Sequence, residues 1–381
     1  MIAQNGTLEI SRSRLMHNVA LMQRRVGMQA KLCATIKADA YGHGVAYVAE
    51  LLHEARVEWV CVYSLEEAME LAQLPWFGVL VLSPMVIGEG EVIDPEAIEA
   101  LRGQIRVNLT DKQSAIRLAK ALEAARIDRP VNVHVQVDAG LTRMGVEPWE
   151  AEELVEVIAG LKQLRLEGLF AHFSHGDVPQ HDTVEEQLKV LHAVADPLKE
   201  RYPHLLLHLQ NSGGAWHVAD PSLGMVRLGI AVYGLQPSTS DPVEGLLPIA
   251  RVTAPILAIH ERPPGTGVGY GHTFVTKRAS RLAIVPVGYA DGYPRAMTNR
   301  SVAQVRGVDV PVVGRVSMDQ IILDVTDVPQ ACVGDVVTVI SWDAGKQNSL
   351  DAMADVMGTI GYELATHLGA GGGRLKRVIV D

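Results

Sequence analysis

The pattern of apolar and polar residues divides the first part of the chain into short apolar runs separated by longer amphipathic ones. The apolar runs are continuous rather than alternating, which is typical of strands buried on both faces of a parallel sheet. They cover residues 31–36, 58–63, 78–83, 104–109, 131–137, 166–172, 205–210 and 225–230. Between them, 64–74 and 110–127 have helical periodicity, and each opens with Ser or Thr and carries an acidic residue in its first turn, as helices commonly begin.

This alternation predicts an α/β fold, and the number of strands favours an N-terminal (β/α)8 TIM barrel. An open, doubly wound sheet is the alternative, but it typically needs fewer strands. No GxGxxG motif follows the first strand, which weakens a dinucleotide-binding version of that alternative.

The pattern changes after a polar, proline-containing segment at 233–242, which is typical of a linker. Beyond it, short strands alternate with Gly, Pro and Asp turns, and one short helix is expected at 349–358. We therefore expect the barrel over residues 1–240 and a mostly-β domain over residues 241–381. Residues 1–10 are expected to pair with this second domain.

Composition narrows the possible functions. The chain has 381 residues, of which 44 are acidic and 34 basic, and a net charge of -10 argues against a nucleic-acid surface. Its three cysteines, Cys33, Cys61 and Cys332, are far apart, so we expect neither a disulfide framework nor a zinc cluster and place the protein in a reducing cytoplasm. The N-terminus lacks a signal-peptide pattern, and no apolar run is long enough to span a membrane.

The first candidate for chemistry is Lys37, directly after the first predicted strand. Catalytic groups of a barrel lie at the carboxyl ends of its strands. A lysine there, in partly apolar surroundings, can lose its proton and form a Schiff base. The alternative is an ordinary lysine that reaches solvent from the end of a strand.

The last two predicted strands end in groups that suit a phosphate. Gly229 and Ile230 can offer backbone N–H groups, and Asn211 and Ser212 follow the strand before. Arg227 lies within the last apolar strand, where a guanidinium needs a partner. The structural alternatives are a packing glycine, a structural arginine and a helix cap.

Two further strands place Arg143 and His172 at the same end of the barrel. His172 and His175 have an HxxH spacing that is compatible with a metal site. We favour a structural interpretation, because only Asp177 is available nearby as a third ligand. No metal is therefore expected.

Several motifs together resemble one known family. KADAYGHG at 37–44, MVRLGIAVYGLQPS at 225–238, VGYGHTF at 268–274, VGYADG at 287–292 and GRVSMDQ at 314–320 are similar, in this order, to motifs of the alanine racemases. These are fold-type III enzymes that depend on pyridoxal phosphate. The resemblance covers nearly the whole chain, including the second domain.

The resemblance implies an isomerase that interconverts L- and D-alanine, supplying D-alanine for peptidoglycan, with pyridoxal 5'-phosphate held on Lys37. Arg227 would face the pyridine nitrogen with His172 bonded to it, and Arg143 would approach the phenolic oxygen of the cofactor and the substrate. The residues implied to hold the phosphate end are Tyr41, Asn211, Ser212, Gly229, Ile230 and Tyr362.

The resemblance further implies a homodimer with shared active sites. Tyr270 would be a second base and the backbone N–H of Met318 would bind the substrate carboxylate, both in the barrel of the partner subunit. The positions implied to line the substrate entrance are Asp177, Tyr289, Arg295, Arg315, Asp319 and Ile360.

The chemistry agrees with these roles. Racemisation removes the α-proton on one face and returns a proton on the other, and Lys37 with Tyr270 can serve both directions. An arginine is a donor that keeps its proton, so Arg227 would bond the ring nitrogen without protonating it. This should limit electron withdrawal and suppress transamination, unlike the aspartate found in many other pyridoxal-phosphate folds.

One position departs from the family pattern. Many members have a carbamylated lysine that orients the active-site arginine, where this chain has Gln136. The hypothesis is that the Gln136 amide, with or without a bound anion such as chloride, positions Arg143. The alternative is that Gln136 only fills the barrel interior.

Other functions remain to be weighed. A non-catalytic pyridoxal-phosphate-binding barrel would lack the second domain and with it Tyr270 and Met318. A basic amino-acid decarboxylase of the same fold type would normally carry a cysteine and acidic residues at its substrate site, and the motifs fit it less well. A serine racemase or one of broader specificity stays open.

Overall fold

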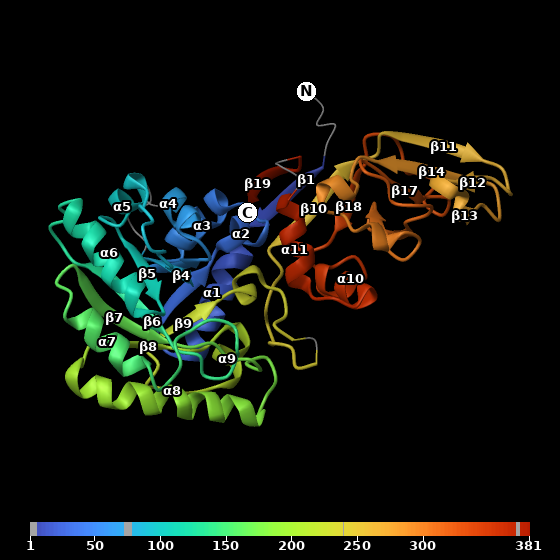
Figure 1. Cartoon of the computed structure of the whole chain (residues 1–381). Helices are drawn as coiled ribbons and strands as arrows, with labels where there is room; N and C mark the ends of the chain where they lie inside the picture. The colour runs from blue at the N-terminus through green and yellow to red at the C-terminus, as the bar shows by residue number, and fades with distance from the viewer. Residues whose placement is uncertain (1–5, 72–77, 239, 371–373) are drawn as a thin grey trace.

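The computed structural model describes residues 6–71, 78–238, 240–370 and 374–381, which form a barrel and a β-rich region beside it (Figure 1). Parts of three predictions lie outside the described residues. They are residues 1–5 of the N-terminal segment, 72–74 of the helix expected at 64–74, and Thr239 of the expected linker.

The barrel is an eight-stranded parallel sheet in the order β8-β7-β6-β5-β4-β3-β2-β9. It closes between β8 and β9 through two backbone bonds, Gly224 N–H to Leu207 O at 2.9 Å and Arg227 N–H to Gln210 O at 3.0 Å. The predicted barrel is therefore confirmed, with each strand within a few residues of its predicted place. The strands are β2 (Lys31–Thr35), β3 (Trp59–Val62), β4 (Gly78–Pro84), β5 (Ile105–Leu109), β6 (Val131–Gln136), β7 (Leu164–Phe170), β8 (Leu206–His208) and β9 (Met225–Leu228).

Helices surround this sheet (Figure 1). In α6, Asp111 caps the first turn by accepting the Ser114 N–H, and Ala115, Leu118 and Leu122 form the buried face at helical spacing. The barrel helices are α1 (Arg12–Val26), α2 (Lys37–Tyr41), α3 (Val45–Glu54), α4 (Leu65–Leu71), α5 (Pro95–Ala100), α6 (Lys112–Ala124), α7 (Ala151–Ala159), α8 (Asp182–Arg201), α9 (Ser212–His217) and the 3-10 turn η1 (Ile230–Tyr233).

The β-rich region contains a six-stranded sheet in the order β16-β15-β18-β10-β1-β19 and smaller sheets β11-β14-β17 and β12-β13. The N-terminal strand β1 (Thr7–Ser11) lies in this region, antiparallel to β10 and parallel to β19. Its other strands are β10 (Ala250–Pro255), β11 (Ala258–Arg262), β12 (Gly267–Val268), β13 (Phe274–Val275), β14 (Ser280–Val285), β15 (Val302–Val305), β16 (Val308–Pro311), β17 (Ile321–Asp324), β18 (Val336–Ile340) and β19 (Lys376–Val380).

Two helices and three short turns complete the β-rich region. The helix expected at 349–358 is α10 (Leu350–Met357), but α11 (Gly361–Ala370) was not predicted. Its apolar stripe is narrow, with Leu364, Ala365 and Leu368 buried between small and polar residues. The turns are η2 (Tyr270–His272), η3 (Tyr289–Asp291) and η4 (Arg295–Met297). Within the described ranges, no helix is long and apolar enough to cross a membrane.

Candidate active site

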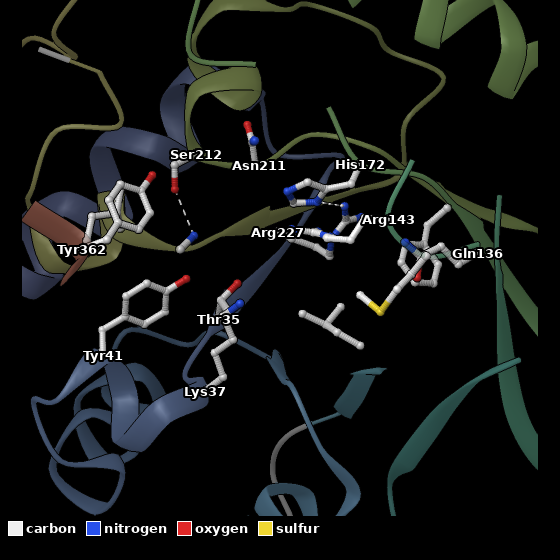
Figure 2. A pocket seen from close by; sticks show the side chains of 15 residues that line it. Thr35, Lys37, Tyr41, Gln136, Arg143, His172, Asn211, Ser212, Arg227 and Tyr362 are labelled. Carbon is white, nitrogen blue, oxygen red and sulfur yellow. Dashed lines mark hydrogen bonds between the residues drawn. The ribbon is translucent and has the colours of Figure 1, made fainter. Parts of the chain in front are cut away.

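A cavity of about 280 Å³ opens at the carboxyl ends of the barrel strands. Figure 2 shows Lys37 and Tyr41 on one side and Asn211, Ser212 and Arg227 across from them. Every residue expected to hold the cofactor lines this one cavity, although they come from six separate segments of the chain. They are Lys37, Tyr41, Arg143, His172, Asn211, Ser212, Arg227, Gly229, Ile230 and Tyr362.

Lys37 begins a short helix that is left-handed. The four residues after it, Ala38 to Tyr41, all have positive φ, between 52° and 54°. A left-handed turn costs roughly 1–2 kcal/mol for each residue with a Cβ, so the surrounding structure must hold it. The turn reverses the chain directly after β2 and brings both Lys37 and Tyr41 to the cavity.

The left-handed turn is held at both ends. Glu67 accepts the Ala38 N–H at 2.7 Å, and Asp39 accepts the Val45 N–H at 2.8 Å at the start of α3. Arg377, from the last strand of the chain, donates to Asp39 at 2.6 Å. Gly42 follows the turn with φ of 80°, and a Cβ there would lie 2.3 Å from the Ala365 carbonyl oxygen of α11. The unpredicted helix α11 therefore packs directly against the lysine segment.

A polar cradle lies across the cavity from this turn. The Ser212 hydroxyl accepts the Gly229 N–H at 2.9 Å and the Ala231 N–H at 3.3 Å. A Cβ on Gly229 would lie 2.8 Å from the hydroxyl of Tyr41, so a side chain there would fill the cradle. Burial raises the pKa of Tyr41 well above its usual value, so this hydroxyl keeps its proton and can donate it to an anion.

Asn211 and Tyr362 complete this end of the cavity. Asn211 caps α9, accepting the Gly214 N–H at 2.9 Å, so the structural alternative for this residue also holds. Tyr362 lies on α11 with its ring centre 6.1 Å from that of Tyr41. Burial raises the pKa of Tyr362 as well. Hydroxyl and amide groups thus gather at one end of the cavity, which is the donor set that a phosphate prefers.

Arg227 occupies the middle of the cavity and is only 3% exposed. It donates to the Ala171 carbonyl at 2.7 Å, to His172 Nδ1 at 3.1 Å and to His208 Nδ1 at 2.5 Å. Burial lowers the pKa of Arg227 to about 10, so it stays a cation at neutral pH. Burial and the charge of Arg227 lower the pKa of His172 to about 3, so this ring is a neutral acceptor.

Gln136 and Arg143 lie on the same side of the cavity, away from the two tyrosines (Figure 2). The Gln136 amide oxygen accepts the Asn108 amide N–H at 2.9 Å. Asn108 also donates to the Leu82 carbonyl at 2.8 Å, and its own amide oxygen is buried without a hydrogen-bond partner. The Gln136 amide oxygen, which the sequence hypothesis assigned as an acceptor for Arg143, thus already accepts one hydrogen bond from Asn108 and has one lone pair remaining.

The two histidines of the HxxH pattern have different surroundings. His172 binds Arg227, whereas His175 Nδ1 lies 2.9 Å from the Ser174 hydroxyl and its ring stacks on His181 at 3.9 Å. Among the described residues, no group of three or more His, Cys, Asp or Glu side chains could hold a metal ion.

Tyr270 and Met318 do not line this cavity. Tyr270 is 72% exposed and Met318 51% exposed. Tyr270 begins η2 between β12 and β13, and Figure 1 shows these strands at the end of the molecule farthest from the barrel. The structure therefore does not bring Tyr270 to the cavity of its own chain.

The positions expected at the substrate entrance fall into two groups. Asp177 lies at the mouth of the barrel, where a Cβ on Gly213 would be 2.6 Å from its Cα. Asp319 binds Arg374 at 2.7 Å in the β-rich region. The others of that region are Tyr289 and Arg295, which share a cavity of about 460 Å³, Arg315 beside the Gly269 turn, and the exposed Ile360.

Sequence reasoning missed several residues of the site. Four fill the cavity walls, and they are Thr35, Leu82, Met144 and Phe170. A chain of polar side chains below Arg227 was also missed, comprising His208, His134, Glu167 and Arg106. A usable signal existed, since His134, Glu167 and His208 are ionisable residues within strands of the barrel sheet.

Comparisons with known proteins agree with this geometry. Family models described as "Alanine racemase, N-terminal domain" and "Alanine racemase, C-terminal domain" match residues 10–237 and 249–379. The chain is 35% identical over 369 residues to an alanine racemase of Synechocystis sp., covering 96% of each, and 36% identical over 359 residues to one of Halothermothrix orenii, covering 93% of this chain and 92% of that one. It is also similar to the solved alanine racemase of Clostridium difficile 630, with a TM-score of 0.88 and 29% identity, covering 100% of this chain and 97% of that one. The chain belongs to the alanine racemase family.

Proposed function

We propose that the chain interconverts L- and D-alanine with pyridoxal 5'-phosphate as cofactor and with Lys37 and Tyr270 as its two bases. The observation that carries the proposal is the single cavity in which a lysine, a hydroxyl and amide cradle and a buried arginine meet. Membership of the family supports the reaction, and the donor set of the cavity supports the cofactor.

The residues present fit this cofactor. Its phosphate would be held by the cradle of Ser212, Gly229 and Ile230, which a side chain on Gly229 would block. Tyr41, Asn211 and Tyr362 would add hydroxyl and amide contacts, and Arg227 would donate to the ring nitrogen. When bound, pyridoxal phosphate supplies an electron sink that delocalises the charge left when the α-proton is removed.

Lys37 acts twice in this proposal. Its amine would hold the cofactor, and it would also move a proton at the α-carbon on one face of the substrate. The left-handed turn fixes where the lysine starts, so its amine has a defined approach to the cavity. Arg227 stays protonated and donates hydrogen bonds to neutral acceptors such as His172. A guanidinium cation has no acceptor of its own, so Arg227 can only donate.

Tyr270 serves the opposite face, from a second copy of the chain. Its exposure and its distance from its own barrel support a homodimer in which η2 enters the barrel mouth of the partner. Met318 would then bind the substrate carboxylate through its backbone N–H. The same arrangement would place Tyr289, Arg295, Arg315, Asp319 and Ile360 around the entrance with Asp177 of the barrel.

Arg143 would contact the phenolic oxygen of the cofactor and the substrate carboxylate. Gln136 would position it through the remaining lone pair of its amide oxygen or through a bound anion such as chloride. Glutamine cannot be carbamylated, so we expect activity to be independent of carbon dioxide.

We assign residues 1–240 to the cofactor-binding domain and 241–381 to the domain that serves the partner, with β1 joined to the latter by its pairing with β10 and β19. The three cysteines are free, which suits a cytoplasmic enzyme that makes D-alanine for peptidoglycan. A racemase of serine or of broader specificity is the second candidate, because Leu82 and Met144 leave the cavity wall adaptable.

The test combines cofactor chemistry with product analysis. The purified protein should be yellow, and borohydride should fix the cofactor to Lys37, which peptide mass spectrometry identifies. Individual L-amino acids are then incubated with the protein and analysed on a chiral column, with alanine expected to react fastest. A reduced adduct on another lysine, or faster reaction of serine, would contradict the corresponding part of the proposal.

A further inference from the structure

A line of buried and partly buried polar side chains runs through the barrel from the cavity toward the opposite end. It starts at Arg227, continues through His208 and His134, and ends at Glu167, which Arg106 binds from the other side. Successive contacts measure 2.5 Å, 2.8 Å and 3.2 Å, and the Arg106 contact measures 2.9 Å. Both histidines are 0% exposed. Buried polar groups of this kind are costly unless every one of them is bonded.

The backbone is shaped to place these groups. In the pairing of β6 with β7, Val133 lies opposite Leu166 and His134 lies opposite Gly168, so Glu167 is an extra residue in a β-bulge. A bulge commonly re-aims a side chain, and here the side chain of Glu167 meets His134. Gly168 makes room, since a Cβ there would lie 2.4 Å from His134 Nδ1.

The two ends of the line fix the position of every proton in it. Glu167 is an ionised acceptor, because hydrogen bonds from His134 and Arg106 outweigh the opposing effect of burial and lower its pKa to about 2. His134 must therefore carry its proton on Nε2 and accept at Nδ1. Arg227 can only donate, so His208 must accept at Nδ1 and carry its proton on Nε2. The two requirements agree, and burial lowers the pKa of both histidines, which keeps them neutral.

Among the described residues, no carboxylate bonds to Arg227, whose hydrogen-bond partners are two neutral imidazoles and the carbonyls of Ala171 and Leu209. Its orientation therefore depends on His208 presenting a lone pair, and His208 does so only in one tautomer. We propose that Glu167 is a positioning residue for racemisation, which acts through the ordered rings of His134 and His208 to fix the guanidinium of Arg227 at the cofactor's ring. This inference rests on the proposed role of Arg227.

The decisive variant is Glu167→Gln, which keeps the shape of the side chain and removes its charge. Arg106 and Asn132 both donate to the carboxylate, and in the variant they would compete for the single amide oxygen. The amide NH2 would then face His134 Nε2, which would have to accept. Reversing the tautomers of His134 and His208 places an N–H of His208 against an N–H of Arg227.

The first readout is independent of activity. Nitrogen-15 NMR of ring-labelled histidines in the full-length protein, with and without cofactor, reports which nitrogen of each ring carries the proton. His134→Gln and His208→Gln assign the two resonances. The wild type is expected to show Nε2–H for both rings, and Glu167→Gln a mixed or reversed state. Unchanged tautomers in Glu167→Gln would overturn the proposal.

The second readout is catalytic. In Glu167→Gln, kcat should fall by about tenfold, the scale on which loss of an outer partner weakens a directly acting group, with KM changed less and the share of transamination increased. Glu167→Asp keeps the charge but moves it away from His134, so its kcat should lie between those of the wild type and Glu167→Gln. It also replaces the glutamine variant in the test if that variant fails to fold. Glu156→Gln, which removes a surface partner of Arg201, is the control and should match the wild type.

The outcomes separate this inference from the proposed function. If Arg227→Gln raises transamination and Glu167→Gln behaves like Glu156→Gln, only the role of Glu167 is refuted. If Arg227→Gln leaves reaction specificity unchanged, the proposed role of Arg227 fails, while the NMR still reports the tautomers. A kcat loss in Glu167→Gln that merely follows a fall in Tm, with wild-type tautomers, would mean that Glu167 is structural.

Discussion

The residues of the barrel cavity and those of the β-rich region differ in how completely their own chain holds them. In the barrel, Arg227 and Ser212 are buried and bonded to neighbours from other strands. In the β-rich region, Tyr270 and Met318 are mostly exposed. The first set is preorganised, as the binding of a resident group requires. Tyr270 and Met318 present exposed apolar and hydroxyl groups that their own chain does not cover.

This difference separates two tasks of the enzyme. In the proposed function, cofactor binding would be built into one chain, whereas a complete pair of bases would require two copies. Changes in the two regions should therefore have separable effects, on cofactor retention in one case and on proton transfer in the other.

The largest expected effect comes from Tyr270→Phe, which removes the proposed second base and leaves the barrel intact. Racemisation should fall by about 10²–10⁴-fold, the usual contribution of a positioned acid or base, while cofactor absorbance stays at the wild-type level. Exchange of the α-hydrogen with deuterated solvent should slow more for L-alanine than for D-alanine, because Lys37 serves the D side. Proton NMR of each enantiomer measures this, and Tyr202→Phe in the barrel is the control. Equal, wild-type exchange from both enantiomers would remove Tyr270 from the mechanism.

The second prediction mixes the two regions between chains. Lys37→Ala and Tyr270→Phe should each be inactive, but a hybrid dimer contains one site with both wild-type bases. Random exchange of equal amounts should restore about a quarter of wild-type activity, since half the dimers are hybrid and each has one intact site. Two affinity tags on the two variants confirm that subunits have exchanged. Purified hybrids without activity would mean that the active site is not shared.

A smaller effect is expected within the cavity from Gln136→Ala. Loss of the proposed hydrogen bond to the Arg143 guanidinium should lower kcat/KM by about fivefold, or ~1 kcal/mol, with cofactor still bound. Activity of the wild type should be the same in carbonate-free and bicarbonate buffers. Unchanged kinetics together with an unmoved Arg143 in a crystal structure of the variant would make Gln136 a filler of the barrel interior.

The smallest effect concerns the joint between the two regions. Asp351 of α10 accepts the Gln236 N–H at 3.2 Å, and burial raises its pKa to about 6. The folded state therefore binds this proton more tightly than the unfolded chain, so the stability that it contributes is present below about pH 4 and is lost as pH rises through 6. Asp351→Asn should raise Tm by a few degrees at pH 8 and not at pH 4. Calorimetry at both pH values checks this, with Asp128→Asn, an exposed position in the barrel region, as control, and an equal gain at both would exclude titration as the cause.

The sequence predicted the barrel well because its signal is local. Continuous apolar runs such as 131–137 report burial on both faces, and Gly- and Ser-rich turns after strands mark the end of the cavity proposed to hold a phosphate. The motif around Lys37 pointed to a lysine that the structure places in the cavity.

Other features depend on contacts between distant residues and leave little local signal. The left-handed turn after Lys37 has no glycine among its four residues of positive φ, so propensity argues against it. The bulge at Glu167 depends on register with β6, and a one-residue insertion is invisible in an apolar pattern. Helix α11 was missed because its buried apolar stripe is narrow. The contact that explains this stripe is the packing of α11 against Gly42, which is distant in sequence.

The hydrogen bond from Arg377 to Asp39 also affects when the lysine segment can reach its final conformation during synthesis. Arg377 lies 338 residues after Asp39 in the sequence, so it is synthesised much later than the lysine segment. The barrel strands can be complete while this arginine has yet to be translated, so the strained lysine turn gains its full set of contacts only after β19 has been synthesised. A nascent chain thus carries Lys37 long before it can hold that lysine in its final conformation. Synthesis of β19 is in this sense a late step in making the site.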